Sequence, residues 1–592
     1  MADNIGIDFG STFSSFASYD KHNDRFERLT DALGNGYIPS VACMHHSGRR
    51  LLFGRQVQTA LANKPWLQTY RGFKMLLHVA KPEDYRKHGY IQQTPTEVAT
   101  QFLESYLIQV ANKIHADQFD NAVICVPEHW IKRSDQMSGR SILLNICRGI
   151  QNKGMPLLKN IRVVSEPVAA TAYFAHNYKR THGGKPFEGD VLIVDYGGGT
   201  LDITLTTVTV RKDAENDGTM EIDVGYRTGC GQNSENKIGD AGLAYMEGVT
   251  REALKNAGIK NPQIDGKFMQ AKDMLEEALM LRVPEIQDWI EQQFKLDIRD
   301  IGSNSEVFLE VDYGAESIEI TYGMLYNVFQ KIIQPVLERY LNEIREYLKT
   351  RKTPYKVAVV GGFGEFPLVQ YAIRDFLDAT DGEMDFALEA EGWRRDAVSY
   401  GAALIAAGQI HVQPRSPYGI GLRILGNNIK FGREAIEYRQ LVPDRNKVYP
   451  LGGAWKDPLT VQNSDDPKNA PWVFSICQKT DSREAIEMTP RSEVHRELRE
   501  KLRRKTELLQ LRLKDQGVNE PIRSYYFGFS MDESLIYTLH IYAAHPLTLK
   551  RIENESIKEE LGNFLYLFGS TVSLNPNEDR SNVLIRENNL TP

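Results

Sequence analysis

Two stretches of this sequence repeat the same order of residue types, and this repeat constrains the fold more than any other feature. The first covers residues 5–12 (IGIDFGST) and the second residues 191–202 (VLIVDYGGGTLD). Each begins with apolar, mostly β-branched residues, which predict a buried strand. An acid ends the strand, a glycine follows two residues later, and a threonine lies four or five residues after the acid.

The glycines after each acid favour a turn that binds an anion. Glycine has no Cβ, so successive backbone N–H groups can point into one concavity. After Thr200 the chain returns to an alternating extended run, which differs from the strand–turn–helix order of a P-loop or dinucleotide site. One such stretch alone is typical of an ordinary glycine-rich hairpin. The repeat favours two hairpins that face each other around one polyphosphate and its metal ion.

Composition limits the class of protein. A chain of 592 residues is too long for one core, so several domains are expected. The net charge of −7 disfavours a general nucleic-acid binder, and no apolar run is long enough for a membrane span or a signal peptide. Five cysteines without CxxC spacing predict a reduced, cytoplasmic protein with neither a zinc site nor a disulfide framework.

The order of predicted elements repeats along the chain. Helices are expected at residues 94–115 (with Thr96 as N-cap), at 132–151, after Glu166, and in the alanine-rich segment 397–404; strands are expected at 121–127, 161–164 and 356–363. A strand, an acid–glycine turn, a hairpin and an alanine-rich helix occur in both halves. The fold class is therefore α/β, with an internally duplicated unit, a cleft between its halves, and two small-residue helices at the hinge.

The predicted domain boundaries follow from this order. Residues 1–408 form the duplicated domain, with lobe I at about 1–185 plus 385–408 and lobe II at about 186–384. A Pro-containing linker at 409–417 precedes a β-rich domain at 418–548. A helix inserted at about 492–514 is rich in Arg and Lys, which fits either a solvated face or a partner contact. Residues 549–592 are expected to form a short helix (555–568) and a tail.

The ordered motif set resembles the actin-like (ribonuclease H-like) ATPase superfamily. It consists of the two acid–glycine stretches, Glu166-Pro167, the Val359-Val360-Gly361-Gly362 run and the helix with Tyr400-Gly401-Ala402. Within the superfamily, residues 4–408 are most similar to the 70-kDa heat-shock (DnaK-type) chaperones. Similarity beyond residue 417 is faint, as in a divergent branch with an abbreviated C-terminal region.

The resemblance implies ATP or ADP with Mg²⁺ as the bound ligands. Asp8 and Asp195 would hold the hydrated magnesium ion, which takes few carboxylates and keeps several waters. Backbone N–H groups of residues 10–13 and 197–200 would surround the phosphates. The resemblance implies that the nucleotide is bound by Asp8 and by Gly10, Ser11, Thr12, Phe13, Gly197, Gly198, Gly199, Thr200, Lys272, Gly361, Gly362 and Phe363.

The resemblance also implies catalytic roles for five residues, Asp195 among them. Lys74 would place its charge near the γ-phosphate and the attacking water, and Thr200 would touch the γ-phosphate. Glu166 and Asp202 would orient that water or accept its proton. Taken singly, Lys74 is typical of a solvated lysine, Glu166 of a helix N-terminal acid, and Asp202 of a turn residue. Only the ordered set favours catalysis.

Three features depart from the family pattern. The helix that clamps adenine in the family has Lys-Arg, whereas this chain has Lys272-Asp273, and losing a stacking cation should weaken base recognition. Phe363 stands where the family has a Ser-Thr-Arg run, so its ring could stack on the base instead. The acidic, leucine-rich interdomain linker of the family is replaced by residues 409–412 (QIHV).

Three functions compete on this sequence. The first is an ATP-hydrolysing chaperone-like protein that binds unfolded polypeptide under nucleotide control, with a co-chaperone or nucleotide-exchange factor as partner. The second is a nucleotide-gated scaffold or regulatory protein without peptide release. The third, a small-molecule kinase of the same superfamily, requires an Asp base beside a sugar pocket, and no candidate for that Asp is found.

Overall fold

The computed structural model describes residues 4–45, 48, 50–64, 67–77, 81–86, 88–131, 139–211, 219–230, 241–259, 262, 266–295, 301–313, 316–349, 355–378, 383–384, 393–412, 419–428, 433–442, 459–462, 473–479, 486–487, 493–522, 524–531, 537–544, 564–572 and 586–587. The chain forms two compact units: Met1–Trp130 with Ile142–Gln413, and Ile131–Ser141 with Pro414–Pro592. Among the described helices, none is both long enough and apolar enough to cross a bilayer.

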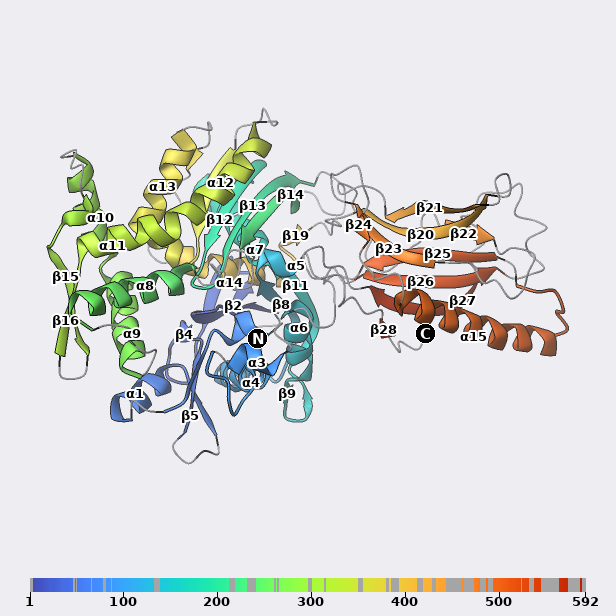
Figure 1. Cartoon of the computed structure of the whole chain (residues 1–592), viewed down its shortest axis with the longest axis horizontal. Coiled ribbons are helices and arrows are strands. Elements are labelled where there is room, and N and C mark those ends of the chain that lie inside the picture. The colour runs from blue at the N-terminus through green and yellow to red at the C-terminus, as the bar shows by residue number, and fades with distance from the viewer. Residues whose placement is uncertain are drawn as a thin grey trace. The chain divides into compact units, whose positions relative to one another are not determined.

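The first unit is a mixed α/β structure (Figure 1). The strands along residues 1–413 are β1 (Asn4–Asp8), β2 (Phe13–Asp20), β3 (Arg25–Leu29), β4 (Ile38–Pro39), β5 (Val41–Met44), β6 (Leu51–Phe53), β7 (Thr69–Arg71), β8 (Phe119–Val126), β9 (Gln151–Asn152), β10 (Met155–Pro156), β11 (Leu158–Ser165), β12 (Gly189–Tyr196), β13 (Leu201–Val210), β14 (Met220–Cys230), β15 (Val307–Tyr313), β16 (Glu316–Thr321), β17 (Tyr355–Val360), β18 (Glu383–Met384) and β19 (Ile410–Val412). The helices are α1 (Arg55–Asn63), α2 (Phe73–Leu76), α3 (Pro82–Arg86), α4 (Pro95–Lys113), α5 (Glu128–Ile131), α6 (Gly139–Gly149), α7 (Glu166–Thr181), α8 (Ala241–Asn256), α9 (Gly266–Leu281), α10 (Val283–Lys295), α11 (Tyr322–Val328), α12 (Gln334–Leu348), α13 (Pro367–Asp378) and α14 (Trp393–Ala406), with a π-turn at η2 (Phe329–Ile333) and 3-10 turns at η1 (Ile301–Ser303) and η3 (Phe363–Glu365).

Two six-stranded sheets of this unit share one strand order. The first runs β11-β8-β1-β2-β3, with β4 also paired to β2, and the second runs β18-β17-β12-β13-β14-β19. In both, an antiparallel hairpin (β1–β2 or β12–β13) is flanked by two further parallel strands on one side. On the other side of the hairpin, β3 pairs antiparallel with β2 in the first sheet, and β14 pairs antiparallel with β13 in the second. The duplicated order of the sequence therefore corresponds to two sheets of the same topology.

The small-residue helices α7 and α14 pack between these two sheets. One apolar cluster joins both helices to residues of β2 and β8 and to residues of β12 and β17, among them Val123 and Val191. The two helices approach so closely that a Cβ on Gly401 would overlap the carbonyl oxygen of Ala169. The opposite face of β12 and β13 packs against α8, α9 and α11–α13 in a second cluster. Alternation along β12, with Val191 and Ile193 on one face and Leu192 and Val194 on the other, explains why both faces are covered.

The second unit contains two described sheets and one long helix. The strands are β20 (Gly419–Asn428), β21 (Arg433–Val442), β22 (Leu459–Gln462), β23 (Val473–Lys479), β24 (Ile486–Glu487), β25 (Ser524–Met531), β26 (Tyr537–Ala544), β27 (Phe564–Val572) and β28 (Arg586–Glu587), and the helix is α15 (Glu493–Asp515). They form sheets β21-β20-β23-β24 and β22-β25-β26-β27-β28. The helix α15 packs against β23 and β27 and buries Leu502 and Leu513.

Three predictions of local structure are wrong. Thr94, not Thr96, caps α4, because it forms a reciprocal capping box with Glu97. Residues 410–412 are not linker: Ile410 is buried, and β19 pairs with β14, while residues 413–417 lie outside the described residues. The helix expected at 555–568 ends as strand β27, whose aromatic residues pair with β26; residues 555–563 are not described. Of the helix expected at 132–151, residues 132–138 are also outside the described residues.

Candidate functional site

Asp8 and Asp195 occupy matching positions at the ends of two β-hairpins. Asp8 is the last residue of β1 and lies opposite Ser15 of β2. Asp195 is the penultimate residue of β12 and lies opposite Asp202 of β13. The next parallel strand, β8 or β17, adjoins each acid on its other side. The local pattern of strand, acid and glycine turn thus places one carboxyl group at the end of each sheet's central hairpin.

The two glycine turns face each other. A Cβ added to Gly198 would overlap the Oγ1 atom of Thr12, and one added to Gly199 would overlap the Oγ atom of Ser11. Gly199 also approaches Met75 of α2, where an added Cβ would lie 3.1 Å from Met75 Cγ. Glycine is required at both positions because of this close approach and not because of backbone conformation.

A third glycine keeps space for Asp195. Gly361 follows β17 with a φ of +84°, a left-handed conformation, and an added Cβ would lie 2.6 Å from Asp195 Oδ1. Gly362, in contrast, has helical φ and ψ values of −62° and −35°, and an added Cβ would meet no atom within 4 Å. Gly361 is therefore needed for packing around Asp195, whereas the space beside Gly362 is open.

Aromatic packing fixes the backbone next to two of the predicted site residues. Phe9, which follows Asp8, stacks on Phe73, which precedes Lys74, with ring centroids 5.8 Å apart. Phe102 of α4 contacts both rings at centroid distances of 6.1 Å and 5.3 Å. All three rings are buried, so the hydrophobic core holds the end of β1 and the start of α2 in one relative position.

Lys74 and Glu166 form a buried ion pair between Nζ and Oε1. Glu166 is the first residue of α7, and Pro167 lies in the first turn, where a missing N–H is tolerated. Burial opposes the charged form of Lys74, but the nearby Glu166 and Asp8 carboxylates outweigh it and raise the pKa of the lysine. The lysine therefore carries a fixed positive charge within a cluster of acids.

Burial disfavours the ionised form of the three aspartates of this cluster. Loss of hydration, followed by the charge of Glu166, raises the pKa of Asp8 from its usual 3.8 to about 7. The same two causes raise the pKa values of Asp195 and Asp202 well above the usual range. Lys74 and these acids act on one another electrostatically, and an excess of buried acid is favourable for a cation.

The donor set fits magnesium. Mg²⁺ takes oxygen ligands, binds few carboxylates and completes its shell with waters and phosphates. Asp8 and Asp195 offer two such carboxylates, and the buried Thr12 Oγ1 and Asp202 Oδ2 atoms have no hydrogen-bond partner in the described structure. In the described part of the chain, no group of three or more His, Cys, Asp or Glu residues is arranged as a metal site.

Backbone hydrogen bonds from within the turn and from α8 hold the second glycine turn. The N–H of Gly197 donates to the carbonyl oxygen of Thr200 at 3.0 Å, and the N–H of Leu243 donates to that of Gly198 at 3.1 Å. The first turn is held similarly, since the N–H of Ser40 donates to the carbonyl oxygen of Thr12 at 2.7 Å. Thr200 is buried, and it lies two residues before Asp202 at the start of β13.

Phe363 is packed among aromatic side chains. Its side chain is buried and contacts the rings of Tyr196, Tyr245 and Phe366 at centroid distances of 5.1, 5.4 and 5.4 Å. The ring belongs to an aromatic cluster of the core directly after Gly361 and Gly362, and its stacking on a base stays a prediction. Lys272 lies buried on α9.

Two features of the site were missed at the sequence level. Asp273, the acid in the position of the family's arginine, pairs with Arg71 of β7, with Oδ2 and Nη2 2.5 Å apart. Glu128 donates its backbone N–H to Asp202 Oδ1 at 3.1 Å. Both contacts join residues more than 70 positions apart. The sequence gives no local signal for either, except that Glu128 follows a buried strand and a proline.

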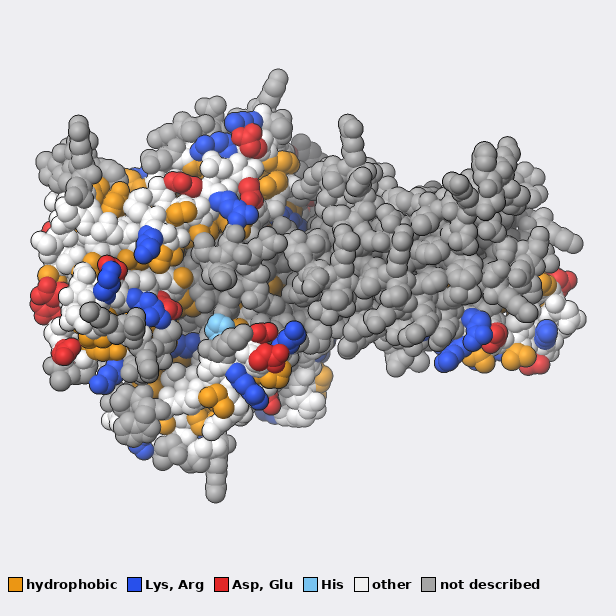
Figure 2. Space-filling view, viewed as in Figure 1, with side chains coloured by type: hydrophobic (Ala, Val, Ile, Leu, Met, Phe, Trp, Pro, Cys, Tyr) orange, Lys and Arg blue, Asp and Glu red, His pale blue; other side chains and the backbone are white. Residues whose placement is uncertain are grey.

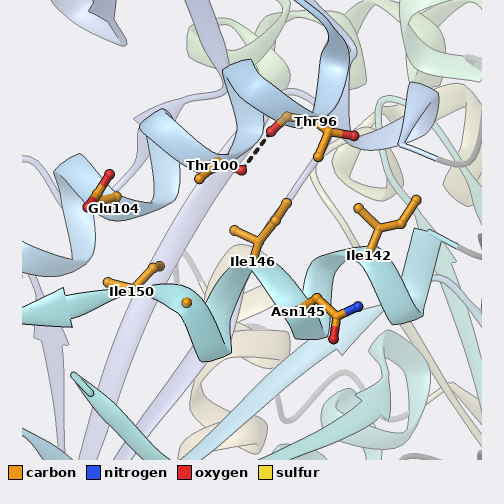
Figure 3. Close-up of a pocket in the computed structure, with 8 residues that line it drawn as sticks. Thr96, Thr100, Glu104, Ile142, Asn145, Ile146 and Ile150 are labelled. Atoms are coloured by element: carbon orange, nitrogen blue, oxygen red, sulfur yellow. Dashed lines mark hydrogen bonds between the residues drawn. The ribbon is translucent and has the colours of Figure 1, made fainter. Parts of the chain in front are cut away.

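A separate pocket of about 350 Å³ lies between α4 and α6 (Figure 3). Its lining residues are Thr96, Thr100, Glu104, Ile142, Asn145, Ile146, Gly149 and Ile150. None of them belongs to the acid–lysine cluster. The hydroxyl of Thr100 donates a hydrogen bond to the carbonyl oxygen of Thr96 at 2.8 Å.

Surface charges are mixed on the face that Figure 2 shows. Basic and acidic side chains alternate there, and no single basic patch is seen among the described residues. On α15 the exposed side chains include Arg504, Leu508, Leu511 and Arg512. This mixture agrees with the net charge of −7.

Comparison with known proteins finds relatives with one common description. The chain is 22% identical over 437 residues to the Heat shock 70 kDa protein 2 of Paracoccidioides lutzii, covering 69% of this chain and 58% of that protein. It is 22% identical over 435 residues to the Heat shock cognate 70 kDa protein 3 of Dictyostelium discoideum (68% and 60%). A third relative, the Heat shock protein 70 homolog of Acanthamoeba polyphaga mimivirus, is 23% identical over 500 residues (79% and 48%).

These matches confirm the resemblance inferred from the motifs. The aligned segments span about half to three fifths of the length of these relatives. No protein-family model matches the chain.

Proposed function

We infer that this chain, a divergent relative of the 70-kDa heat-shock proteins, binds and hydrolyses ATP in a Mg²⁺-dependent reaction. The observation that carries the proposal is the meeting of the two glycine turns, at which Thr12 lies against Gly198. Burial, the charge of Glu166 and then that of Asp8 raise the pKa of Asp195. A polyphosphate between these turns would meet backbone from both hairpins. The buried Lys74 lies among the same acids.

The metal and phosphate roles follow from the donor set. Asp8 and Asp195 would hold Mg²⁺, which when bound neutralises charge on the phosphates. The backbone of residues 10–13 and 197–200 would surround the phosphate oxygens. The adenosine would enter the open space beside Gly362. Gly361 would keep Asp195 in place, and Lys272 on α9 would contribute a positive charge.

The hydrolytic roles fall to the buried acids and the lysine. Lys74 would present its ammonium group to the γ-phosphate, held by Glu166. Thr200 would donate its hydroxyl to the γ-phosphate. Glu166 or the free oxygen of Asp202 would orient the attacking water and accept its proton, and the raised pKa of the buried Asp202 carboxyl group suits this role. Phosphoryl transfer depends mainly on such positioning and charge stabilisation.

The second unit would bind unfolded or extended polypeptide under the control of the bound nucleotide. Support comes from the names of the relatives and from the two described sheets of this unit. A co-chaperone or nucleotide-exchange factor would be a partner, and the cytoplasm the compartment. Nucleotide control requires that peptide affinity differ between ATP and ADP complexes, since coupling between sites is reciprocal.

An alternative is a nucleotide-gated scaffold or regulatory protein without peptide release. It is favoured by the absence of the family's linker sequence, because residues 410–412 form β19 beside β14 instead. A small-molecule kinase is less well supported.

One set of measurements separates these functions. Phosphate release from ATP is measured with and without Mg²⁺, with an unfolded peptide, and with a panel of sugars; peptide affinity is measured with ATP and with ADP. A chaperone-like ATPase releases phosphate in Mg²⁺ and changes its peptide affinity between nucleotides. Release without any change in peptide affinity supports the scaffold, and phosphorylated sugar supports the kinase. An absence of ATP binding would contradict all three.

A further inference from the structure

Glu128 is a fully buried acid that forms an ion pair with Arg227. It follows β8 as the first residue of α5, and only 1% of its surface is exposed. Its Oε1 atom accepts a hydrogen bond from Nη1 of Arg227 at 2.7 Å. Arg227 lies on β14, opposite Thr204 of β13. The pair therefore links the turn after β8 in the first sheet to β14 in the second sheet.

The same residue contacts Asp202 through its backbone. The N–H of Glu128 donates to Asp202 Oδ1 at 3.1 Å, and Asp202 is fully buried. Asp202 Oδ2 has no hydrogen-bond partner in the described structure. One oxygen of the carboxyl group is thus held by the protein, and the other is left without a protein partner.

A glycine of strand β14 leaves space beside the Asp202 carboxyl group. Gly229, the register partner of Asp202, has a φ of +150°, and an added Cβ would lie 3.1 Å from Asp202 Oδ1. Any side chain at position 229 would overlap the carbonyl oxygen of Leu201, at 2.2 Å, and would also crowd the oxygen that Glu128 holds. The backbone of α5 therefore holds Asp202 Oδ1, and β14 leaves the space beside that oxygen free.

We propose that the Glu128–Arg227 ion pair is a positioning device that fixes Asp202 Oδ1 on the α5 backbone, so that Oδ2 alone faces the hydrolytic reaction. The inference rests on the proposed ATPase function and adds Glu128 and Arg227 to it as positioning residues. Arg227 holds the Glu128 side chain, and this anchors the N–H that binds Asp202. A catalytic carboxyl group that rotates by a small amount loses much of its effect, because rate depends steeply on geometry.

The test compares Glu128→Gln with the wild type and with Glu221→Gln. Glu221 also lies on β14, opposite Thr209 of β13 and eight residues before Gly229, and also pairs with an arginine, Arg211. Glu128→Gln is expected to lower kcat by about tenfold or more, with KM and the Kd for ATP unchanged. Glu221→Gln is expected to stay within about twofold of the wild type, as for substitutions away from such features.

Two further measurements separate positioning from a merely structural role. In an Asp202→Asn background, Glu128→Gln is expected to lower kcat no further, because both changes act on one group. If Glu128→Gln does not fold, Glu128→Gln with Arg227→Gln replaces it, since that pair leaves no unpaired buried charge. The crystal structure of the folded variant is expected to show Asp202 in a different rotamer.

The results distinguish failure of the proposed ATPase function from failure of the positioning role of Glu128 and Arg227. A wild type that does not hydrolyse ATP contradicts the proposed function; the positioning role is then decided by whether the Asp202 rotamer changes in the variant. Hydrolysis by the wild type with an unchanged kcat in Glu128→Gln overturns the positioning role alone. A loss of equal size in the Asp202→Asn background also overturns it.

Discussion

Lys74 and Glu166, 92 positions apart in the sequence, form an ion pair in which both side chains are almost completely buried. The pair joins α2 to the first turn of α7, the helix that packs between the two large sheets. A buried pair of this kind is weak evidence for stability by itself, because desolvation offsets the attraction. It lies beside Asp8, Asp195 and Asp202, which is why we propose a role for it in ATP hydrolysis.

Replacing Lys74 with Met should abolish ATP hydrolysis and destabilise the fold. The change leaves Glu166 as a buried charge without its partner, which costs about 3–5 kcal/mol. Phosphate release and urea unfolding measure the two effects. Lys153→Met is the matched control, because its pair with Asp117 is exposed, and we expect a change within about 0.5 kcal/mol. Full hydrolysis by Lys74→Met would exclude a catalytic role for this lysine.

Gly198→Ala tests whether the two glycine turns face each other. The new Cβ would overlap Thr12 Oγ1, and such overpacking costs about 1–3 kcal/mol. Adding Thr12→Ala removes the overlapping atom, so the double variant should recover most of the lost free energy of unfolding. Thermal unfolding of the two single variants and the double variant gives this comparison. Strictly additive effects would mean that the turns do not touch.

Gly362→Ala should weaken ATP binding without weakening the fold. The added Cβ meets no protein atom within 4 Å, and the backbone is helical, so the free energy of unfolding should change by less than about 1 kcal/mol. If adenosine fills the open space, ATP affinity should fall by roughly tenfold, or about 1.4 kcal/mol. Gly149→Ala, which also meets no atom within 4 Å, is the control and should bind ATP normally. Equal affinities for both variants would place the base elsewhere.

Stability without nucleotide should fall as pH rises from about 4 to about 7. The folded-state pKa of Asp8 is raised from 3.8 to about 7, so the native protein holds a proton that the unfolded chain has lost within this window. The stabilising contribution is therefore complete below the unfolded pKa and is lost as pH passes through the folded one. Asp195 and Asp202 act in the same direction.

The measurement is urea unfolding of the wild type and of Asp8→Asn across this pH range. The variant has no carboxyl group at position 8, so its stability should depend less on pH. Asp120→Asn, which removes an exposed partner of Lys159, should keep the wild-type slope. Identical slopes for Asp8→Asn and the wild type would show that Asp8 titrates normally.

Local patterns in the sequence were sufficient for part of this description. The apolar runs before Asp8 and Asp195 predicted strands, since alternation and β-branching are properties of neighbouring residues. The capping box of Thr94 and Glu97 was also readable, although Thr96 was predicted instead. Strand β27 was mistaken for a helix because its aromatic residues fit an amphipathic pattern until pairing with β26 is known.

The sequence by itself determined the repeated acid–glycine stretches and the family that they resemble, because those are properties of residues close together in the chain. Only the tertiary structure decided that Phe363 is buried among Tyr196 and Tyr245, that Asp273 pairs with Arg71, and that Glu128 holds Asp202. These contacts join segments far apart in sequence, and whether a side chain lies in the core or in a site depends on what the fold packs against it.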